Sequence, residues 1–398
     1  MKDTIEIYYQ SAYIKEFDAT VTGCEKATLE GQNLFLLTLD RTAFFPEQGG
    51  QTSDFGILTT EDGVTCSIKN VSIDEDHIIR HLSDTCLEPG TKIHGKIDWE
   101  HRFSNMQQHT GEHIFSGIVH SRFGFDNVGF HLSDQEVTMD YNGVLTEADI
   151  CEIEMLANRA IWENIDVVCE FPSKEALANI DYRSKKELDG DVRIVSIRGY
   201  DACACCAPHV LKTGEIGILK VVGLQNYKKG VRVNILCGKR ALEYICAEHT
   251  IVSKLSGIFT TSRDNIIASV KRNADEMSKT KAELSETREK LIEAEIKEID
   301  PGLFDVFLIK EQGYDANVMR KTVNALAALH GGFCGVFSGN SQSGYNFVLC
   351  SGKEGKDAKQ FLEQIKERFE VKGGGSPKMI QGSISCQEED LLNMIHGL

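Results

Sequence analysis

The sequence of 398 residues has no long apolar run and no excess of basic residues. No stretch approaches the roughly 20 consecutive apolar residues that a membrane span needs, so we expect no transmembrane segment. The first residues, Met1–Phe17, alternate apolar and charged side chains and lack the apolar core of a secretory signal. This predicts a first strand and a cytoplasmic protein.

The net charge of −17 counts against non-specific binding to nucleic acid. Lysine and arginine contacts to phosphate supply most of the affinity in such binding, and this chain is rich in carboxylates instead. An RNA partner that is recognised by its shape through small basic patches remains compatible with this charge.

The thirteen cysteines are an odd number, and no secretory signal accompanies them. An odd count leaves at least one thiol unpaired, and cytosolic thiols stay reduced, so we expect metal binding to outrank disulfide formation. Six cysteines show no ligand-like spacing and are expected to pack as small apolar side chains. They are Cys24, Cys66, Cys86, Cys151, Cys334 and Cys350.

Length and apolar periodicity predict a multidomain α+β protein. The expected parts are residues 1–95, a β-barrel or sandwich; 96–240, an α/β domain; 241–299, a helical segment; and 300–398, a small α/β domain. In the first part, period-two alternation predicts strands at Lys2–Tyr9, Leu34–Leu39 and Ser67–Ile73. Residues 42–56, TAFFPEQGGQTSDFG, are expected to form a hairpin connection, because proline and paired glycines interrupt regular structure.

Two helices are predicted with particular features. Thr146 is a good N-cap for a helix over Thr146–Asn164. Between residues 241 and 299 an alternating three-four spacing of apolar residues predicts a short coiled coil or helical hairpin, and it favours a homodimer. The apolar positions are Ile267, Val270, Ala274, Met277, Leu284 and Leu291.

The stretch QQHTGEHIFSGI, residues 107–118, carries the first chemical signal. Its apolar spacing predicts an amphipathic helix, on which His109, Glu112 and His113 lie within an arc of about 100°. All three side chains can therefore reach one metal ion. The H-x-x-E-H order is also typical of a class of zinc peptidases.

A second signal follows in the loop around CACCAPH, residues 203–209. Cys205 and His209 are spaced C-x-x-x-H, and with His109 and His113 they make a set suited to tetrahedral zinc. Cys203 or Cys206 could take the place of Cys205 as the thiol ligand.

Five stretches in one order resemble a known family. The stretches are FFPEQGGQTSDFG, IDWEHRFSNMQQHTGEH, CCAPHVLKTGEIG, the helical segment and KGGGSPKMIQG. With these, the chain is similar to the editing half of alanyl-tRNA synthetases and, most closely, to the long form of the free-standing alanyl-tRNA editing proteins. The resemblance implies a zinc-dependent deacylase that frees tRNA(Ala) from serine or glycine, and no ATP-dependent activation of amino acids.

The resemblance also implies roles for individual residues. It makes residues 96–240 the editing domain and residues 300–398 a tRNA-binding domain. The implied zinc ligands are His109, His113, Cys205 and His209. A glycine-rich loop beside the aminoacyl pocket would contain Gly49, Gly50 and Gln51, and the implied tRNA contacts are Gly373, Gly374, Gly375 and Lys378.

The chain departs from the family at two places. The second cluster of the family commonly reads C-G-G-T-H, whereas this chain has CCAPH at residues 205–209, where proline stiffens the loop. The residue before the second histidine is often a threonine associated with the substrate hydroxyl, and here it is Glu112. Recognition of the hydroxyl then falls to Thr110, Gln108 or Asn127, and Glu112 becomes a candidate general base.

Three other functions use the same residues. A zinc peptidase would use His109, Glu112 and His113 but usually takes its third ligand from a downstream helix. A metal-dependent lyase acting on a small sulfur compound would leave the helical segment and the last domain without a role. A zinc-stabilised RNA-binding protein would need the metal for folding and not for turnover.

Overall fold

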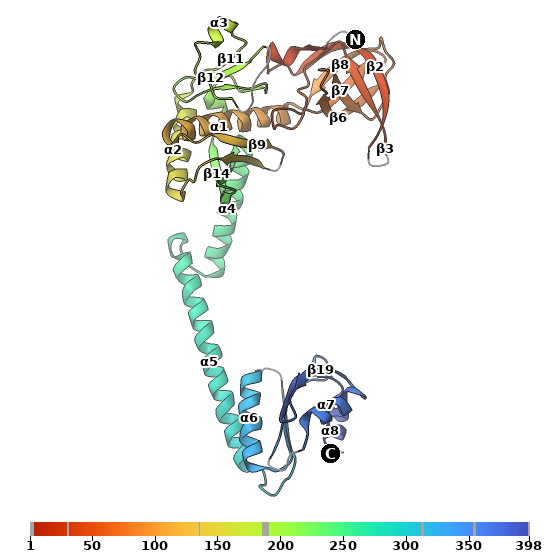
Figure 1. The fold of residues 1–398 in the computed structure, drawn as a ribbon, viewed down its shortest axis with the longest axis vertical. Helices are drawn as coiled ribbons and strands as arrows, with labels where there is room; N and C mark the ends of the chain where they lie inside the picture. Colours follow the sequence, from red (N-terminus) through yellow and green to blue (C-terminus); the bar gives the residue numbers. More distant parts are fainter. Residues whose placement is uncertain are drawn as a thin grey trace. The chain divides into compact units, whose positions relative to one another are not determined.

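The computed structural model describes residues 4–29, 32–134, 136–184, 191–311, 314–352 and 356–396. The chain divides into two compact units, Met1–Val252 and Ser253–Leu398 (Figure 1). It has the multidomain α+β architecture that the sequence predicts. Among the described residues, no helix is both long enough and apolar enough to cross a bilayer. The cytoplasmic location stays a prediction.

The N-terminal part is a closed barrel of six strands, in agreement with the expected β-barrel. Alternate residues face its interior. In the last strand, Ile93 and Ile97 are buried, and buried and exposed residues alternate along its whole length. In their order around the barrel the strands are β2 (Glu16–Leu29), β3 (Gln32–Leu39), β7 (Ile79–Ser83), β6 (Thr65–Ile73), β5 (Gly56–Thr60) and β8 (Lys92–Ile97).

The prediction of a first strand over Lys2–Tyr9 is wrong for Ile7–Tyr9, and residues 2 and 3 lie outside the described residues. Strand β1 covers only Ile5–Glu6, where it pairs in parallel with β4 (Arg41–Thr42), and a 3-10 turn follows over Ile7–Tyr9. Ile7 and Tyr8 are consecutive and both buried, which an alternating strand cannot achieve. The tyrosine ring packs edge-on against Phe45, with ring centroids 5.5 Å apart.

The expectation that Cys24 and Cys86 are simply packed thiols is also wrong. Cys24 lies on β2, Cys86 follows β7, and the two form a disulfide with a Cα–Cα distance of 6.3 Å. The two strands are far apart in the sequence, and the barrel brings these positions within the range that a disulfide spans.

His81 is buried in the barrel wall and is held by hydrogen bonds at both ring nitrogens. Its Nδ1–H donates to the Leu37 carbonyl (3.1 Å), and its Nε2 accepts from Thr42 Oγ1 (2.9 Å). Burial lowers the pKa of His81 to about 4, against a partial opposing effect of the Leu37 carbonyl. The neutral ring is therefore the form that the folded barrel accommodates.

We expect acid to destabilise the protein through this histidine. Between pH ~6.5 and pH ~4 the unfolded chain binds a proton at His81 that the folded barrel does not, so stability falls as the pH falls. The loss approaches about 3 kcal/mol of unfolding free energy at the lower end of that window. In urea titrations at pH 7.5, 6 and 5, the unfolding free energy of His81→Gln should change less with pH than that of the wild type. Equal slopes would contradict this assignment.

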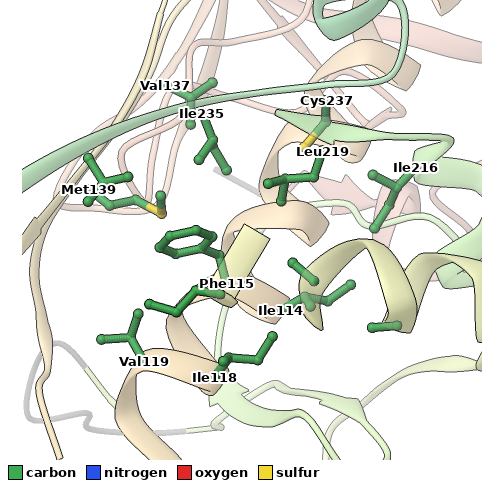
Figure 2. Packing of buried hydrophobic residues seen from close by; sticks show 14 of the residues in the cluster. Ile114, Phe115, Ile118, Val119, Val137, Met139, Ile216, Leu219, Ile235 and Cys237 are labelled. Carbon is green, nitrogen blue, oxygen red and sulfur yellow. The ribbon is translucent and has the colours of Figure 1, made fainter. Parts of the chain in front are cut away.

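The rest of the first unit is built around one long helix, α1 (Trp99–Phe123). The Asp98 side chain caps its first turn, and it ends at Gly124 in the left-handed conformation. Its middle turns are buried on all sides. Ile114, Phe115 and Ile118 pack among residues of the neighbouring sheet, as Figure 2 shows.

Two antiparallel sheets and a second helix surround α1. Thr146 is the N-cap of helix α2 (Glu147–Glu163), as predicted, and it forms a capping box with Asp149. The larger sheet has the order β14 (Leu219–Tyr227), β15 (Gly230–Cys237), β10 (Val137–Tyr141) and β9 (Asn127–Leu132). The smaller sheet has the order β11 (Val167–Glu170), β12 (Ile194–Ile197) and β13 (Asp201–Ala204), and a short helix α3 (Lys174–Leu177) precedes β12.

The predicted helical segment consists of two helices, α4 (Gly238–Ile258) and α5 (Ile266–Glu298). Residues between them break the segment, including Thr260 with a positive φ of 47°. The apolar positions of the predicted seam on α5 are exposed in this single chain. They are Ile267, Val270, Met277, Leu284 and Leu291. The coiled coil and the homodimer stay predictions.

The C-terminal sheet is covered by helices on both faces. The sheet order is β16 (Val306–Lys310), β17 (Phe333–Asn340), β18 (Gly344–Ser351), β20 (Met379–Ser385) and β19 (Glu370–Gly375), with helices α6 (Ala316–Leu329), α7 (Ala358–Lys366) and α8 (Glu388–His396). Along strand β17, Phe333 and Phe337 point into one apolar cluster, and Cys334 and Val336 point into the other. The first cluster includes residues of α7 and α8, and the second includes residues of α5 and α6.

Candidate metal centre

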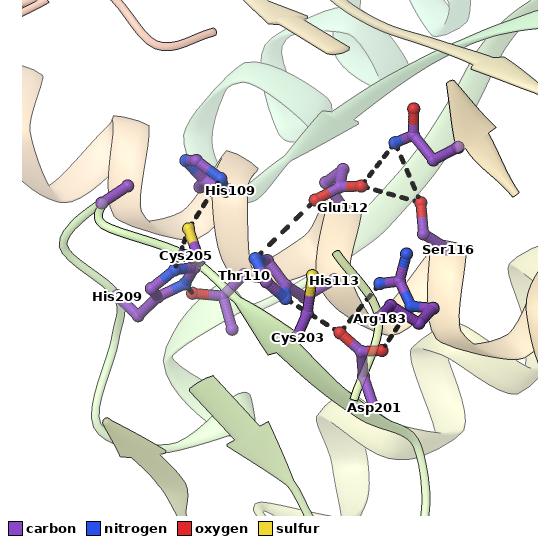
Figure 3. A network of polar contacts seen from close by, with 12 residues as sticks. His109, Thr110, Glu112, His113, Ser116, Arg183, Asp201, Cys203, Cys205 and His209 are labelled. Carbon is purple, nitrogen blue, oxygen red and sulfur yellow. Dashed lines mark hydrogen bonds and ion pairs between the residues drawn. The ribbon is translucent and has the colours of Figure 1, made fainter. Parts of the chain in front are cut away.

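The four residues proposed from the sequence as metal ligands lie together in the first unit (Figure 3). His109 and His113 come from adjacent turns of α1, and Cys205 and His209 come from the loop after β13. Cys205 Sγ lies 3.5 Å from His109 Nε2 and 3.4 Å from His209 Nε2. One donor atom from each residue falls within 4.8 Å of the others, so the four atoms can surround a single ion.

Each of the three histidines is hydrogen-bonded through the nitrogen on the other side of its ring. Nδ1 of His109 lies 2.8 Å from Gln51 Oε1, and Nδ1 of His113 lies 2.9 Å from Asp201 Oδ2. Nδ1 of His209 lies 3.0 Å from Thr110 Oγ1, whose own proton is donated to the Met106 carbonyl. These acceptors place the ring proton on Nδ1 and leave Nε2 as the ligand nitrogen, which is the usual arrangement around a bound metal.

Electrostatics distinguish two of these histidines. Burial, reinforced by His113 and His109, lowers the pKa of His209 well below its ordinary value and keeps its ring neutral. Burial also lowers the pKa of His113, but Asp201 and the neighbouring acidic groups outweigh it, so the net pKa is raised. A neutral imidazole binds metal directly, and a carboxylate partner strengthens an imidazole as a ligand.

Asp201 and Arg183 belong to this site, and sequence reasoning missed both. Arg183 donates to both oxygens of Asp201, at 2.7 Å from Nε and 2.9 Å from Nη2, while Asp201 holds His113. The carboxylate of Asp201 is almost completely buried and is therefore paired. Asp201 lies four residues before Cys205, so the cluster motif itself could have drawn attention to it. Arg183 lies in a segment that has no recognisable motif of potential ligands.

The alternatives to Cys205 are placed differently. Cys203 points toward His113 and Asp201 and forms a second group of potential ligands that shares His113 with the first. Cys206 lies against the glycine-rich loop, where a β-carbon on Gly49 would be 3.1 Å from its sulfur, and burial raises its pKa to about 12. The geometry therefore favours Cys205 as the cysteine ligand.

Glu112 is held rigidly at the edge of the cluster. Its Oε1 accepts hydrogen bonds from Ser116 Oγ (2.8 Å) and from Asn127 Nδ2 (2.6 Å). Its Oε2 lies 3.9 Å from His113 Nε2, on the side of the ligand atoms (Figure 3). Its carboxylate is thus fixed beside the place where a metal ion would sit.

The three side chains expected to read a substrate hydroxyl are engaged within the protein. Thr110 bonds Met106 and His209, and Asn127 bonds Glu112. Gln108 accepts from the Cys237 amide (2.7 Å) and donates to its carbonyl (2.9 Å). These contacts count against all three as hydroxyl readers, because each polar group already has a partner.

The glycine-rich loop reaches the candidate metal centre and is not the hairpin connection expected from its composition. It joins β4 to β5, which do not pair with each other, and it lies along β9. Leu132 N donates to the Gly50 carbonyl (2.7 Å), and Thr52 N donates to the Leu132 carbonyl (3.2 Å). Gly50 has φ 81°, and a β-carbon there would lie 2.6 Å from the Phe130 carbonyl. Only glycine fits, and this path places Gln51 over His109.

Comparison with known proteins agrees with these motifs. Residues 2–101 match the family of class II (A) tRNA synthetases, and residues 192–234 match the threonyl and alanyl tRNA synthetase second additional domain. The alanyl-tRNA editing protein AlaX-L of Pyrococcus horikoshii is 25% identical over 98% of this chain and 96% of its own. This chain is a relative of the alanyl-tRNA editing proteins.

Two further relatives define the extent of the similarity. The alanyl-tRNA editing protein Aarsd1 of Danio rerio is 28% identical over 68% of this chain and 66% of its own. The alanine–tRNA ligase of Ignicoccus hospitalis is 26% identical over 97% of this chain but only 42% of its own. The chain therefore spans less than half the length of the ligases that it matches.

The match to an editing protein extends through the C-terminal unit, which contains the other predicted site. Gly373, Gly374 and Gly375 lie on the edge strand β19 and line a groove of about 910 Å³. A β-carbon on Gly373 would lie 2.6 Å from the Gln381 carbonyl, so the close pairing of β19 with β20 requires glycine there. Lys378 is exposed in the turn that joins these strands and does not line the groove.

Proposed function

We propose that this chain hydrolyses the ester bond of tRNA(Ala) that carries serine or glycine by mistake, acting on the mischarged tRNA after a synthetase has released it. The observation that carries the proposal is the cluster of His109, His113, Cys205 and His209 beside a fixed carboxylate. It occurs in a chain that is similar to an editing protein from end to end.

Zinc is the metal that we propose for this centre. One thiolate and three imidazoles are a donor set that zinc prefers, and three oriented rings support it. A bound zinc ion would supply a Lewis acid that polarises an ester carbonyl or lowers the pKa of a water molecule.

The residues of the chain account for the remaining chemistry. Glu112, held by Ser116 and Asn127, would take a proton from the attacking water, whose oxygen adds to the ester carbonyl. The bond between the carbonyl carbon and the ribose oxygen then breaks, and the ribose oxygen receives the proton from Glu112. An aminoacyl ester is labile, so this positioning is most of what catalysis requires.

Two alternatives are weaker on structural grounds. A peptidase of the H-x-x-E-H type would take a ligand from a downstream helix, whereas here Cys205 and His209 come from a loop. One observation favours a purely structural metal. The cluster offers four protein ligands, and a site with four protein ligands usually has no open position for substrate or water. Metal removal separates the two cases. The protein unfolds when a structural metal is removed, whereas it loses activity but keeps its fold when a catalytic metal is removed.

We also propose that the C-terminal unit binds tRNA along the groove at Gly373, Gly374 and Gly375, with Lys378 at its end. Exposed backbone on an edge strand lets a flat base approach closely, and Lys372 and Arg320 add positive charge to the groove. A homodimer formed through the exposed apolar seam of α5 is part of the same proposal.

We expect purified protein to release serine and glycine from charged tRNA(Ala) well above the spontaneous rate, and to leave alanine largely in place. The variant Glu112→Gln should lose about 10²- to 10⁴-fold in the rate of serine release, because it removes the proposed general base. Its metal content, measured by mass spectrometry, should equal that of the wild type. Serine release at the spontaneous rate in the wild type would refute the proposed function.

A further inference from the structure

Unpaired buried polar atoms concentrate in the glycine-rich loop. Among the described residues, six buried side-chain nitrogen or oxygen atoms have no hydrogen-bond partner, and three of them lie between residues 48 and 52. Those three are Gln48 Nε2, Gln51 Nε2 and Thr52 Oγ1. Leaving a buried donor unpaired costs roughly 1–3 kcal/mol, so such groups call for a ligand or water.

Gln51 is the one of the three whose orientation is fixed by the metal centre. When His109 binds metal through Nε2, its Nδ1 carries the proton and must donate to an oxygen. That oxygen is Gln51 Oε1, at 2.8 Å. The other end of the amide, Nε2, is therefore a donor, and Gln51 is only 1% exposed.

The competing donors near the cluster are already used. Thr110 gives its proton to the Met106 carbonyl, and Gln108 Nε2 gives one to the Cys237 carbonyl. Asn127 Nδ2 donates to Glu112 and approaches Ser116. Unlike Thr110, Gln108 and Asn127, Gln51 combines a contact to a histidine of the cluster with a donor that lacks a partner.

We propose that Gln51 determines amino-acid specificity by donating a hydrogen bond from Nε2 to the side-chain hydroxyl of the seryl ester. This inference rests on the proposed function. Alanine has no hydroxyl, so an alanyl ester cannot form this bond, and the bond favours the seryl ester over the alanyl ester. Glycine also lacks the hydroxyl, so its release does not depend on this donor.

The test separates the two ends of the amide. Gln51→Glu keeps an oxygen to accept from His109 Nδ1–H but removes the donor, and Gln51→Met removes both. We expect Gln51→Glu to keep stoichiometric zinc, to lose about 10- to 100-fold in serine release, and to change glycine release by less than about 3-fold. Gln51→Met should in addition bind zinc about 10- to 100-fold more weakly.

Gln225→Glu is the matched control, because it makes the same change at an exposed position on β14, and it should leave both rates unchanged. All rates are measured at saturating zinc, so that the ratio of serine to glycine release decides the outcome. If the wild type releases serine and this ratio is unchanged in both Gln51 variants, Gln51 does not read the hydroxyl, although the proposed function stands. If the wild type releases neither amino acid, the proposed function fails and the inference fails with it.

Discussion

Cys205→Ser is expected to abolish stoichiometric zinc binding and serine release. Cys205 Sγ lies within 3.5 Å of two histidine nitrogens, so its loss removes the only thiolate of the cluster. Loss of an outer partner typically costs up to about 100-fold in metal affinity, and loss of a direct ligand should cost more. Zinc content and deacylation of seryl-tRNA(Ala) measure the two effects.

Cys203→Ser and Cys206→Ser are matched controls, since they make the same change within two residues. Both should retain zinc, because neither sulfur belongs to the group formed by His109, His113, Cys205 and His209. Loss of zinc in Cys203→Ser with retention in Cys205→Ser would instead assign the ligand to Cys203.

Arg102→Met is expected to destabilise the first unit by about 3–5 kcal/mol. Arg102 and Asp54 form an ion pair in which both side chains are fully buried. Arg102 also donates to the carbonyls of Ala12 (2.9 Å) and Ala43 (2.6 Å), and Asp54 accepts from the Phe45 amide (2.6 Å). Removing the guanidinium leaves the buried Asp54 carboxylate without a counter-charge and takes one donor from each of the two carbonyls. Urea unfolding monitored by far-UV circular dichroism measures the loss.

Arg122→Met on the same helix is the matched control. Arg122 pairs with Glu152 on the surface, where both side chains are about half exposed. Exposed pairs contribute roughly 0–1 kcal/mol, so this variant should unfold almost as the wild type does. A similar loss of unfolding free energy in the two variants would mean that burial does not increase the contribution of the Arg102–Asp54 pair to stability.

Local patterns in the sequence predicted local structure well. The apolar spacing around His109 and His113 placed both on one helix, and Thr146 was identified as an N-cap from its own side chain. Such features depend on residues within one or two turns. The first strand was mispredicted because Tyr8 is buried against Phe45, which lies far along the chain in the loop between β4 and β5.

The supporting residues of the candidate metal centre are positioned by contacts that no local pattern encodes. Gln51 is 58 residues from His109, and Asp201 is 88 residues from His113. Their pairing follows from the path of the glycine-rich loop along β9 and from the position of β13 beside α1. The contacts of Thr110, Gln108 and Asn127 could not be predicted for the same reason, since the protein groups that they bond are mostly distant in sequence.

The groups around the three histidines fix the charge of the centre. Gln51 and Thr110 are neutral, and the negative charge of Asp201 is matched by Arg183, so this outer layer adds no net charge. A divalent ion with the Cys205 thiolate and three neutral imidazoles would carry one positive charge. The carboxylate of Glu112 is the nearby group that offsets it. A proton taken up by Glu112 would therefore leave the centre with a net positive charge at the stage when negative charge develops on the ester oxygen.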